Sequence, residues 1–473
     1  MKRIYFALLL CAALLSVSAC KKNNIVDSAE DVLSSIQLTP AKDNALRYYV
    51  DLDFDSPCSY RINYWESSSP SKVRSTRTFE SEGKSGRTVI MFVKPETDYS
   101  FNVTVISSGK EFTTEKSFDF TTKSLPLGVP TYTLDSKYGD SFVLPGYILH
   151  GQASSPTGYL VFTDTDGNVV WYQDFDEAVR HFYFDQESRS FVVLTGFKNS
   201  LSDIQFQRFC NKFVRIDLEG NIIEEWKTSS DNVEFPHHDV KILDDGSLVL
   251  LHGVARNYDL SPIGGNPSVD VYGDGFTVFD KDGKQTFTWD TSCELDPVND
   301  TYLNVLDMYY DLVHANSVSR DTDGNYYFTL NNLNELWKID GRNGDVLYRV
   351  GGHGDVSVPE NGHTSGIHSS VPLAPDRILV LDNGSTKNIS RALIYKVDAA
   401  AKTASVELSV AIPSEYSSTD RSNCELLTDQ ELIFFGSTAG RCCLFTDMEG
   451  NVKKVIKRNG ISYRTHYFPD IEY

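Results

Sequence analysis

Positive charge is scarce in this 473-residue sequence. Lysine and arginine together number 44, against 65 aspartates and glutamates, so the formal net charge is −21 at pH 7. A protein that binds nucleic acid or an anionic membrane surface needs a concentrated positive field, which such a composition does not supply. The sequence therefore predicts no nucleic-acid partner.

Sustained helical periodicity is missing, and no long apolar run occurs after the first twenty residues. The sequence instead contains 25 tyrosines, 27 phenylalanines and 31 glycines, with many short runs in which aromatic and β-branched residues alternate with polar ones. Runs of this kind, bounded by turn residues, are typical of β-strands. The composition therefore predicts an all-β protein.

The first twenty residues have the parts of a secretory signal. Lys2 and Arg3 precede a short apolar core, and small residues lead up to Cys20. The apolar core is too short to span a bilayer, so the pattern predicts a signal peptide over residues 1–19. The ending Ser-Val-Ser-Ala-Cys resembles a bacterial lipobox, which implies cleavage before Cys20 and a lipid on its thiol. Ordinary cleavage that leaves Cys20 free is the alternative.

The residues after Cys20 are polar and begin with lysine, so the acidic residue that signals inner-membrane retention is not seen. We expect residues 20–32 to be a lipidated tether. The globular part is then expected outside the cytoplasm, in the cell envelope (periplasm or outer membrane), with its membrane contact made through the lipid anchor alone.

No CxxC spacing occurs among the cysteines that follow Cys20, so their positions indicate neither a metal motif nor a disulfide pairing. Both isolated buried thiols and disulfides, which an exported location permits, stay open. These cysteines are Cys58, Cys210, Cys293, Cys424, Cys442 and Cys443.

Residues 33–125 contain a first block of strand-like runs, among them YYVDLDF, SYRINYW and SFNVTVIS. Alternation at this pitch is typical of a small two-sheet β-sandwich. Residues 93–105 resemble the turn and strand of a fibronectin type III domain, in which a tyrosine hydroxyl anchors the corner. No catalytic constellation occurs here, so we expect a spacer or docking domain, followed by a linker at 124–130.

Residues 126–473 repeat one hairpin pattern, in which a strand ends at aspartate, a turn follows and a second strand begins. The lead aspartates are Asp164, Asp217, Asp280, Asp340, Asp398 and Asp447. Their spacing suits one four-stranded sheet for each copy. We therefore predict a six-bladed β-propeller over residues 126–473, because radial repetition protects the sheet edges that an open array exposes. Six hairpins in a long sandwich are the alternative.

A second unit recurs between these hairpins: a polar residue, a short strand, a turn and a strongly apolar strand. Its polar position is occupied in turn by His181, His238, His314, His368 and Ser422, with His314 displaced by two residues from the common spacing. The start of a propeller's innermost strand faces the mouth of the channel, so these side chains are predicted to converge. One histidine at a strand end is usually structural, but four in register indicate a site.

Histidine suits group transfer, because neutral imidazole acts as a nucleophile or base near neutral pH and its protonated form acts as a general acid or an anion clamp. His353, His363 and His368 lie close together in the sequence, but their spacing fits no metal motif. We therefore predict no metal and no cofactor.

With these histidines, the sequence resembles the bacterial aryl-sulfate sulfotransferases, which are periplasmic and independent of PAPS. The resemblance covers most of residues 140–473, and its parts occur in the family's order. They are Asp-Gly-Asn-Val-Val-Trp at 166–171, His-His-Asp at 237–239, His-Ala-Asn-Ser-Val at 314–318, His368 before Leu-Asp-Asn-Gly at 381–384, and Ser390-Arg391 before Tyr-Lys-Val-Asp at 395–398. The family also places a small β-sandwich before a six-bladed propeller.

The resemblance implies a ping-pong reaction on small aryl sulfates and phenols. A channel histidine takes the sulfuryl group from the donor, releases a phenol and passes the group to a second phenol. By motif position His368 is the nucleophile that forms the sulfohistidine. His314 and His238 then bind sulfate oxygens or move the phenolic proton, and His237 is a further substrate-binding candidate.

One departure from the family pattern concerns positive charge. The family has an arginine downstream of the HxNS histidine, and counting from His314 places Asn332 there. Asparagine donates a hydrogen bond but has no charge and no bidentate fork, which puts the substrate range and the activity itself in question. We expect Asn332 and Arg391 to take part in substrate binding, with Arg256 and Arg320 as other arginines able to supply the charge.

Two other functions stay open from the sequence. The first is a non-catalytic propeller lipoprotein that binds a glycan or an envelope partner, with the aromatic stretch at 307–310 able to stack on sugar rings. The second is another enzyme on the same scaffold, a lyase or hydrolase that uses the histidines as acid and base.

Overall fold

The computed structural model describes residues 26–138, 142–153, 157–196, 210, 212–227 and 235–473. The predicted signal peptide and Cys20 lie outside these residues. The fold is all-β, as the composition predicts: the one described α-helix is α1 (Val305–Met308). The other described helical segments are single turns at Ala29–Asp31, Ser136–Tyr138, Ser261–Ile263, Thr291–Cys293, Glu360–Gly362, Ser414–Tyr416 and Thr428–Gln430. Within the described ranges, no helix has the length and apolar character needed to cross a bilayer.

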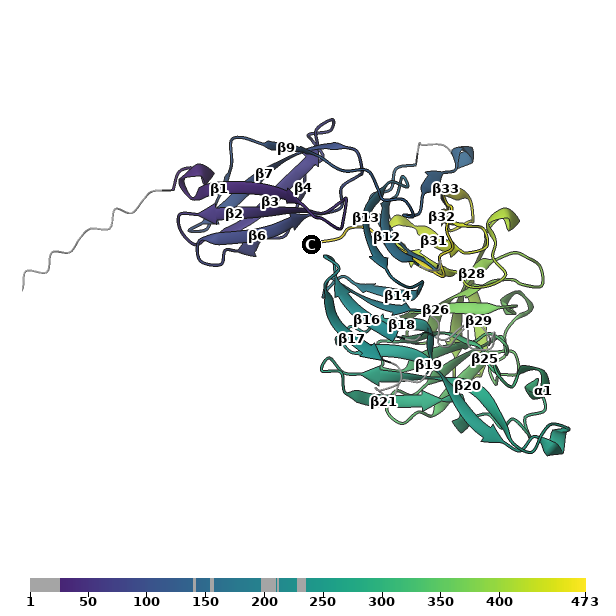
Figure 1. The fold of residues 1–473 in the computed structure, drawn as a ribbon. Coiled ribbons are helices and arrows are strands. Elements are labelled where there is room, and N and C mark those ends of the chain that lie inside the picture. The colour runs from purple at the N-terminus through teal and green to yellow at the C-terminus, as the bar shows by residue number, and fades with distance from the viewer. Residues whose placement is uncertain (1–25, 139–141, 154–156, 197–209, 211, 228–234) are drawn as a thin grey trace, which may run out of the picture.

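The first block of the chain consists of two antiparallel sheets, drawn in purple and blue in Figure 1. One sheet has the order β1 (Leu33–Pro40), β2 (Tyr48–Phe54), β6 (Ser85–Ile90). The other is built around β3 (Ser59–Glu66) and β7 (Asp98–Ser107), with β4 (Arg74–Ser75), β5 (Phe79–Glu80), β8 (Lys110–Thr113) and β9 (Phe118–Thr121) beside them. Alternate residues of β2 and β3 are buried, as expected for strands with one face on a core.

A tyrosine fixes the turn that leads into β7. The Tyr99 hydroxyl accepts a hydrogen bond from the Lys94 backbone N–H at 2.9 Å, and the Tyr99 ring is buried. This contact ties the strand to the preceding turn in the segment that resembles a fibronectin type III corner.

The rest of the described chain forms six further antiparallel sheets. In five of them the strands follow chain order from the innermost strand outward. The first two are β14 (Val179–Asp185), β15 (Ser190–Thr195), β16 (Lys212–Asp217), β17 (Ile222–Lys227), and β18 (Pro236–Ile242), β19 (Leu248–Tyr258), β20 (Val269–Phe279), β21 (Gln285–Asp290). The next three are β22 (Ala315–Arg320), β23 (Tyr326–Leu330), β24 (Glu335–Ile339), β25 (Val346–Gly351); β26 (Ile367–Ala374), β27 (Arg377–Asp382), β28 (Arg391–Asp398), β29 (Thr403–Ala411); and β30 (Asn423–Leu427), β31 (Leu432–Ser437), β32 (Cys442–Asp447), β33 (Val452–Arg458), with β10 (Tyr132–Leu134) added outside β33.

The sixth sheet joins the two ends of this region. Its order is β34 (Thr465–Phe468), β11 (Tyr147–Gln152), β12 (Gly158–Asp164), β13 (Val169–Phe175), so the last described strand pairs with β11, more than three hundred residues earlier. The strands β14, β18, β22, β26 and β30 contact one another in succession, β30 contacts β34, and β14 contacts β11. The series of sheets therefore closes on itself.

The predicted hairpins are present, and their lead aspartates have a local role. Each of the six ends or directly follows the third strand of its sheet, counted from the inside. Asp164, for example, accepts hydrogen bonds at one carboxylate oxygen from the backbone N–H groups of Asp166 and Asn168. Such an Asx turn favours the tight connection to the fourth strand, which explains why aspartate recurs there.

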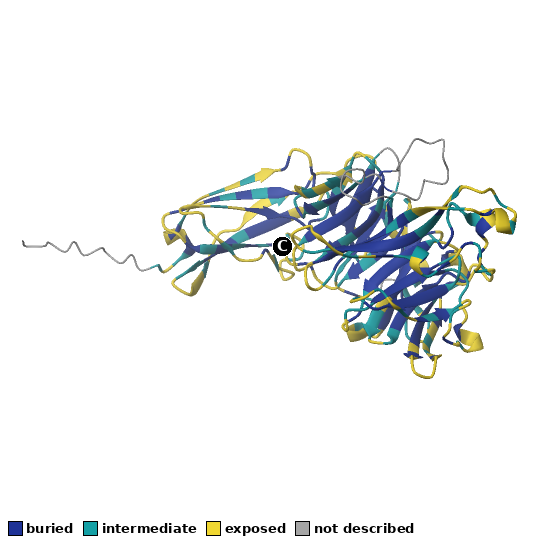
Figure 2. Ribbon diagram, turned by 90° about the horizontal axis from the view of Figure 1, so that it is seen from below, coloured by how far each residue is buried: buried dark blue, intermediate teal, exposed yellow. Residues whose placement is uncertain are grey.

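Tryptophans on the outer strands hold neighbouring sheets together. The Trp171 indole on β13 donates a 2.9 Å hydrogen bond to the Leu218 carbonyl in the turn of the next sheet. Trp289 on β21 donates in the same way to Gly344, also at 2.9 Å. Both rings are buried, so the second half of the repeat serves contact between the sheets. Figure 2 shows the buried residues concentrated in the strands and the exposed ones in the connections.

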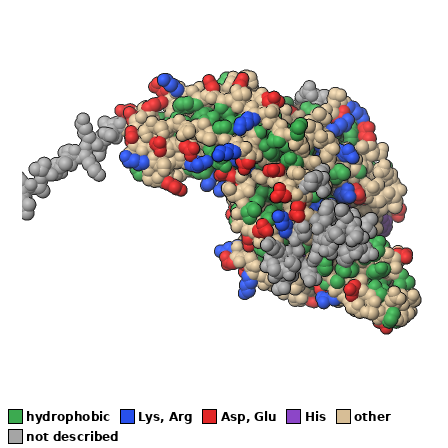
Figure 3. Space-filling view, in the orientation of Figure 1, with side chains coloured by type: hydrophobic (Ala, Val, Ile, Leu, Met, Phe, Trp, Pro, Cys, Tyr) green, Lys and Arg blue, Asp and Glu red, His purple; other side chains and the backbone are tan. Residues whose placement is uncertain are grey.

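The C-terminus connects this region to the first block. After β34 the chain ends at Tyr473, which is buried and whose hydroxyl hydrogen-bonds to the Met91 backbone carbonyl at 3.0 Å. Phe92 of the first block packs against Phe162 of β12 with ring centroids 5.5 Å apart. Figure 1 shows the C-terminus between the two parts, and Figure 3 shows acidic and basic side chains interspersed over the visible face of the first block.

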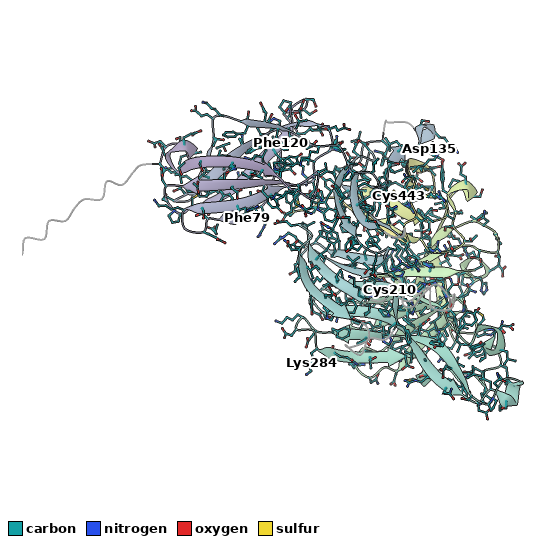
Figure 4. All side chains as sticks on the ribbon, in the orientation of Figure 1. Phe79, Phe120, Asp135, Cys210, Lys284 and Cys443 are labelled. Atoms are coloured by element: carbon teal, nitrogen blue, oxygen red, sulfur yellow. The ribbon has the colours of Figure 1, made fainter. Side chains whose placement is uncertain are left out.

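The six described cysteines are free thiols. Cys293 is exposed and the other five are buried. Burial raises the pKa of the Cys210 thiol to about 12. Cys210 and Cys443, labelled in Figure 4, belong to separate hydrophobic clusters of the core. The reading of these cysteines as isolated buried thiols fits all of them except Cys293.

Candidate active site

Residues from all six innermost strands meet at one end of these strands, five through their side chains and Ser422 through its backbone carbonyl, which contacts His368. Each occupies the start of its strand or the residues just before it: His181 on β14, His238 on β18, His314 before β22, His368 on β26, Ser422 before β30, and Tyr463 before β34. The first five are the residues that the repeat predicts. Tyr463 occupies the sixth equivalent position.

Ring contacts show that these side chains form one cluster. The ring centroid of His238 lies 5.4 Å from that of His181, 5.0 Å from that of His314 and 5.5 Å from that of Tyr463. Tyr463 also contacts His181 at 4.4 Å and His368 at 5.3 Å. Tyr463 therefore contacts three of the histidines, and His238 connects them to His314. We call these four histidines and Tyr463 the histidine cluster.

β-Bulges direct the histidines into the cluster. The pairing register shifts between Val179 and His181, between Pro236 and Val240, between Ala315 and Ser317, and between Ile367 and Ser369. A bulge inserts an extra residue, bends the strand and redirects its side chains, and bulges are common beside active sites.

Several residues at this end have a left-handed backbone. His238, His314 and Ser422 have φ values of 56°, 48° and 78°. Residues other than glycine in this region carry a strain of about 1 kcal/mol or more each, which the surrounding structure has to offset. The same strained conformation at three equivalent positions indicates that the direction of these side chains matters.

His368 has one ring nitrogen available for chemistry. Its Nδ1 lies 3.1 Å from the Ser422 carbonyl oxygen, which can only accept, so Nδ1 carries the proton. Nε2 then has the lone pair, and the Tyr463 hydroxyl donates to it at 3.0 Å. His368 is thus held in the tautomer that a nucleophile needs.

His314 is oriented by an acidic neighbour. Its Nδ1 lies 2.5 Å from Oδ2 of Asp311, so the carboxylate holds the Nδ1–H. Asn332 fixes this segment, because its side-chain amide donates to the Asp311 carbonyl at 2.7 Å and its backbone N–H donates to the Val313 carbonyl. His314 is also the most accessible of the four, with 31% of its side chain exposed. Asn332 therefore positions the strand end that carries His314.

His237 lies behind the cluster and is fully buried. Its Nε2 is 3.0 Å from Oδ1 of Asp274, whose other oxygen accepts the Ala315 backbone N–H at 2.6 Å. The Nδ1 atoms of His237 and His238 are 2.5 Å apart and hydrogen-bonded. In this carboxylate–imidazole–imidazole chain, Nδ1 of His238 donates to Nδ1 of His237 when both rings are neutral.

Arg464 supplies a buried positive charge next to the cluster. It donates to Asp239 at 2.6 Å and to the Asn316 carbonyl at 2.6 Å, and it lies 3.4 Å from the His368 carbonyl. Lys241 also pairs with Asp239, at 3.2 Å. One carboxylate therefore pairs with two cations beside the cluster.

Burial lowers the pKa of His181 and of His368 well below the usual 6.5, and the charge of a neighbouring arginine acts in the same direction: Arg180 beside His181, Arg464 beside His368. Burial also lowers the pKa of His150, which lies outside the cluster on β11. These rings are neutral at pH 7, so His368 is available as a nucleophile.

The depressed histidine pKa values predict acid sensitivity. Below pH 6.5 the unfolded chain takes up protons that the folded chain resists, so the free energy of unfolding falls as pH falls, by up to about 1.4 kcal/mol per pH unit for each such histidine. We expect urea unfolding to show lower stability near pH 5.5 than near pH 7, with a smaller difference in His181→Gln. An equal pH dependence in that variant would contradict burial of a neutral His181.

The three arginines that the sequence analysis selected are paired with other parts of the protein. The described contacts of Arg391 are with Asp382 at 2.9 Å and with the carbonyls of Asn361 and His363, and none is with the histidine cluster. Arg256 pairs with Asp290 at 3.2 Å and Arg320 with Asp245 at 2.7 Å.

Arginines that the sequence analysis did not select come closer. The charge of Arg421 acts on the pKa of His368, and the charges of Arg421 and Arg180 act on that of Tyr463. The signal that identifies them is adjacency: Arg180 precedes His181, Arg421 precedes Ser422 and Arg464 follows Tyr463. Each is a neighbour of a residue in the repeated position.

Two further features bear on other interpretations. Within the described part of the chain, no group of three or more histidine, cysteine, aspartate or glutamate side chains is arranged to hold a metal ion. A cavity of about 650 Å³ lies toward the opposite ends of the innermost strands, lined by Lys241, Ser369, Glu425, Arg464 and His466 among others. Tyr309 and Tyr310 of the aromatic stretch directly follow α1 and are half-buried.

Residues 146–464 match the family model described as Arylsulfotransferase (ASST). This match includes every residue of the histidine cluster and most of the chain. The protein belongs to the arylsulfotransferase family. Membership supports an aryl sulfotransferase activity, with aryl sulfates and phenols as substrates, and agrees with the resemblance in the sequence.

No curated protein matches this arylsulfotransferase chain. Among solved structures, the chain is similar to a protein of unknown function from Bacteroides caccae, at 11% identity and a TM-score of 0.43, over 69% of this chain and 100% of that one. It is also similar to virginiamycin B lyase from Staphylococcus aureus, at 12% identity and a TM-score of 0.32, over 78% of this chain and 93% of that one.

Proposed function

We propose that this protein transfers a sulfuryl group from an aryl sulfate to a phenol by a ping-pong mechanism, through a sulfohistidine on Nε2 of His368. The observation that carries the proposal is the state of that imidazole. Its Nδ1 proton is held by the Ser422 carbonyl, its Nε2 lone pair faces the histidine cluster, and its pKa is lowered by burial.

In the first step, Nε2 of His368 attacks the sulfur of the donor, and the bond from sulfur to the aryl oxygen breaks. The departing phenolate needs a proton. The proposed donor is His314 or His238 in its doubly protonated form, in which Nδ1–H is bound by Asp311 or His237 and Nε2–H gives the proton. General acid catalysis of this kind contributes about 10²- to 10⁴-fold.

In the second step, an incoming phenol gives its proton to the histidine that protonated the first phenolate, His314 or His238, and attacks sulfur from the face that the first phenol left. The bond from Nε2 to sulfur breaks and His368 returns to its starting state. Donor and acceptor use one pocket in turn, as a covalent intermediate allows. We place no cofactor in either step.

Positive charge for the sulfuryl oxygens is proposed to come from Arg464, Arg421 and Arg180 in place of the family arginine at Asn332. Sulfuryl transfer resembles loose phosphoryl transfer, where stabilisation of spread negative charge supplies much of the catalysis. Arg464 is held by Asp239 at 2.6 Å, whereas 44% of the Arg421 side chain is exposed and its contact with Asp420 is longer, at 3.8 Å.

The surrounding architecture is proposed to be a six-bladed β-propeller over residues 126–473, with a fibronectin type III-like β-sandwich at residues 33–125. The six closing sheets and the Tyr99 hydrogen bond support these assignments. We further propose that residues 1–19 are a signal peptide and that lipid on Cys20 anchors the enzyme in the cell envelope, in the periplasm or at the outer membrane.

The proposal is tested by mixing the purified protein with p-nitrophenyl sulfate and phenol in the absence of PAPS. We expect release of p-nitrophenol that depends on phenol, parallel lines in double-reciprocal plots, and phenyl sulfate as the product. Saturable glycan binding with no transfer to any phenol tested would instead favour a non-catalytic binding protein.

A further inference from the structure

Tyr463 places a phenol inside the proposed sulfotransferase site. Its hydroxyl lies 3.0 Å from Nε2 of His368, and its ring contacts His181, His238 and His368. The proposed acceptor of the reaction is also a phenol. The chain therefore holds a side chain with the chemistry of its own substrate next to the nitrogen that carries the sulfuryl group.

The backbone around Tyr463 holds the ring in this direction. The Tyr463 carbonyl accepts hydrogen bonds from the Ser422 backbone N–H at 3.0 Å and from the Thr438 hydroxyl at 3.2 Å. Ser422 is the same residue whose carbonyl holds Nδ1 of His368. The phenol and the imidazole are thus fixed relative to each other through one residue.

The side chain itself lies on irregular backbone. Tyr463 belongs to the connection between β33 and β34 and not to a strand. A distance of 3.0 Å between oxygen and nitrogen leaves no room for a sulfur atom between them, so the hydroxyl has to withdraw when a sulfuryl group sits on Nε2. A connection tolerates such a shift better than a paired strand does.

The charges around Tyr463 favour a sulfate ester at this position. Burial raises the pKa of the Tyr463 hydroxyl, and the charges of Arg464, Arg421 and Arg180 oppose that rise, while Asp239 reinforces it. Three guanidinium groups therefore act on the phenolic oxygen against one carboxylate. A negatively charged group on that oxygen is stabilised by the same cations that receive the substrate.

We propose that Tyr463 is an internal acceptor, sulfated on its hydroxyl by the sulfohistidine of His368 when no soluble phenol is present. The inference rests on the proposed function. The bond from sulfur to Nε2 breaks and a bond from sulfur to the Tyr463 oxygen forms. The phenolic proton goes to the imidazole that protonated the first leaving phenolate, so an aryl sulfate and Tyr463 give a phenol and tyrosine sulfate without another reactant.

Sulfation of Tyr463 has a consequence for turnover. The modified oxygen no longer donates a hydrogen bond to Nε2, and its sulfate occupies the space where the donor's sulfuryl group has to sit. The modified enzyme is therefore blocked until the group returns to His368. Donor without acceptor slows the enzyme, and a soluble phenol protects it by taking the sulfuryl group first.

The test uses the full chain with p-nitrophenyl sulfate as donor. After incubation without acceptor, peptides are analysed by tandem mass spectrometry. We expect one SO₃ group on Tyr463 in the wild type, none on Tyr463 in His368→Ala, and loss of the label when phenol is added in excess. Tyr467→Phe is the matched control: Tyr467 is a buried tyrosine on β34 whose hydroxyl bonds to the Pro145 carbonyl, so its loss leaves the Tyr463 label in place.

The outcomes separate this inference from the proposed function. Transfer to soluble phenol with Tyr463 unmodified overturns the internal acceptor and leaves the sulfotransferase standing. Label on Tyr463 that persists in His368→Ala also overturns it, because the group would then arrive directly from the donor. Absence of transfer to phenol and of label on either residue removes the proposed function and the inference together.

Discussion

His368→Ala is expected to lower sulfuryl transfer from p-nitrophenyl sulfate to phenol about 10⁴-fold or more. The variant lacks the nitrogen that forms the covalent intermediate, and removal of a catalytic nucleophile has effects of this size in other enzymes. The ring is held by Ser422 and Tyr463 alone among the described hydrogen-bond partners, so its loss leaves the sheets paired. The measurement is the initial rate of p-nitrophenol release with phenol present.

His353→Ala is the control for this variant. His353 lies in a connection after β25, where its ring packs on Tyr302 with centroids 4.8 Å apart, away from the histidine cluster. We expect its transfer rate to stay near that of the wild type. Undiminished transfer in His368→Ala would remove His368 as the nucleophile, whereas equal losses in both variants would indicate a general effect on the fold.

Asp239→Ala is expected to lower the free energy of unfolding by about 3 to 5 kcal/mol. Removal of one partner from a buried ion pair leaves an uncompensated charge, which is strongly destabilising. Here two cations depend on one carboxylate, because Arg464 lies 2.6 Å and Lys241 lies 3.2 Å from it. The Val318 backbone N–H also loses its acceptor. Urea unfolding at pH 7 measures the change.

Asp245→Ala provides the matched comparison. Asp245 pairs with Arg320 at 2.7 Å, but 54% of the Asp245 side chain is exposed. Exposed pairs contribute about 0 to 1 kcal/mol, so this variant, which also loses the hydrogen bond that Asp245 accepts from the Ser247 backbone N–H, is expected to lose less stability than Asp239→Ala. Similar losses of stability in the two variants would mean that burial of the Asp239 pair does not set its importance.

The hairpins could be predicted because their signal is local. An aspartate that accepts backbone N–H groups from the following turn favours the same tight connection wherever it occurs, so Asp164 and its five equivalents identify the third strand of each sheet. The fourth strand follows a few residues later. The all-β class and the order of the sheets therefore depend on short-range chemistry that is visible in the sequence.

Convergence of the histidines could be predicted from the repeat, but their geometry could not. The register shifts that direct His181, His238, His314 and His368 arise from bulges. A bulge depends on the partner strand as well as on the strand that carries it, so counting residues along one strand locates the histidine only to within two residues.

Two of the predicted substrate-binding residues, Asn332 and Arg391, make contacts within the protein that hold its structure. Asn332 donates to the Asp311 carbonyl and positions the segment that carries His314. Arg391, on the third strand of its sheet, holds Asp382 and the carbonyls of a connection. Motif order identifies such residues without indicating which way a side chain points from its strand, so their assignment to substrate binding stays a prediction.

Tyr463 and Arg464 were missed for a topological reason. The five other innermost strands are each followed by the rest of their sheet, which makes the unit visible as a repeat. The innermost strand of the remaining sheet is β34, whose partners β11 to β13 come near the start of the region. The histidines were located by counting back from the second strand of each repeated unit. No second strand follows Tyr463 in the sequence, so its position could not be found in this way.

Pairing of β34 with β11 also sets when the enzyme can begin to work. Arg464 crosses to Asp239 and Tyr463 reaches His368, so these two residues complete a constellation whose other members are synthesised much earlier. A nascent chain that extends only to β33 contains the four histidines of the cluster but lacks Tyr463 and Arg464. The complete set of side chains is assembled only after β34 has been synthesised and has paired with β11.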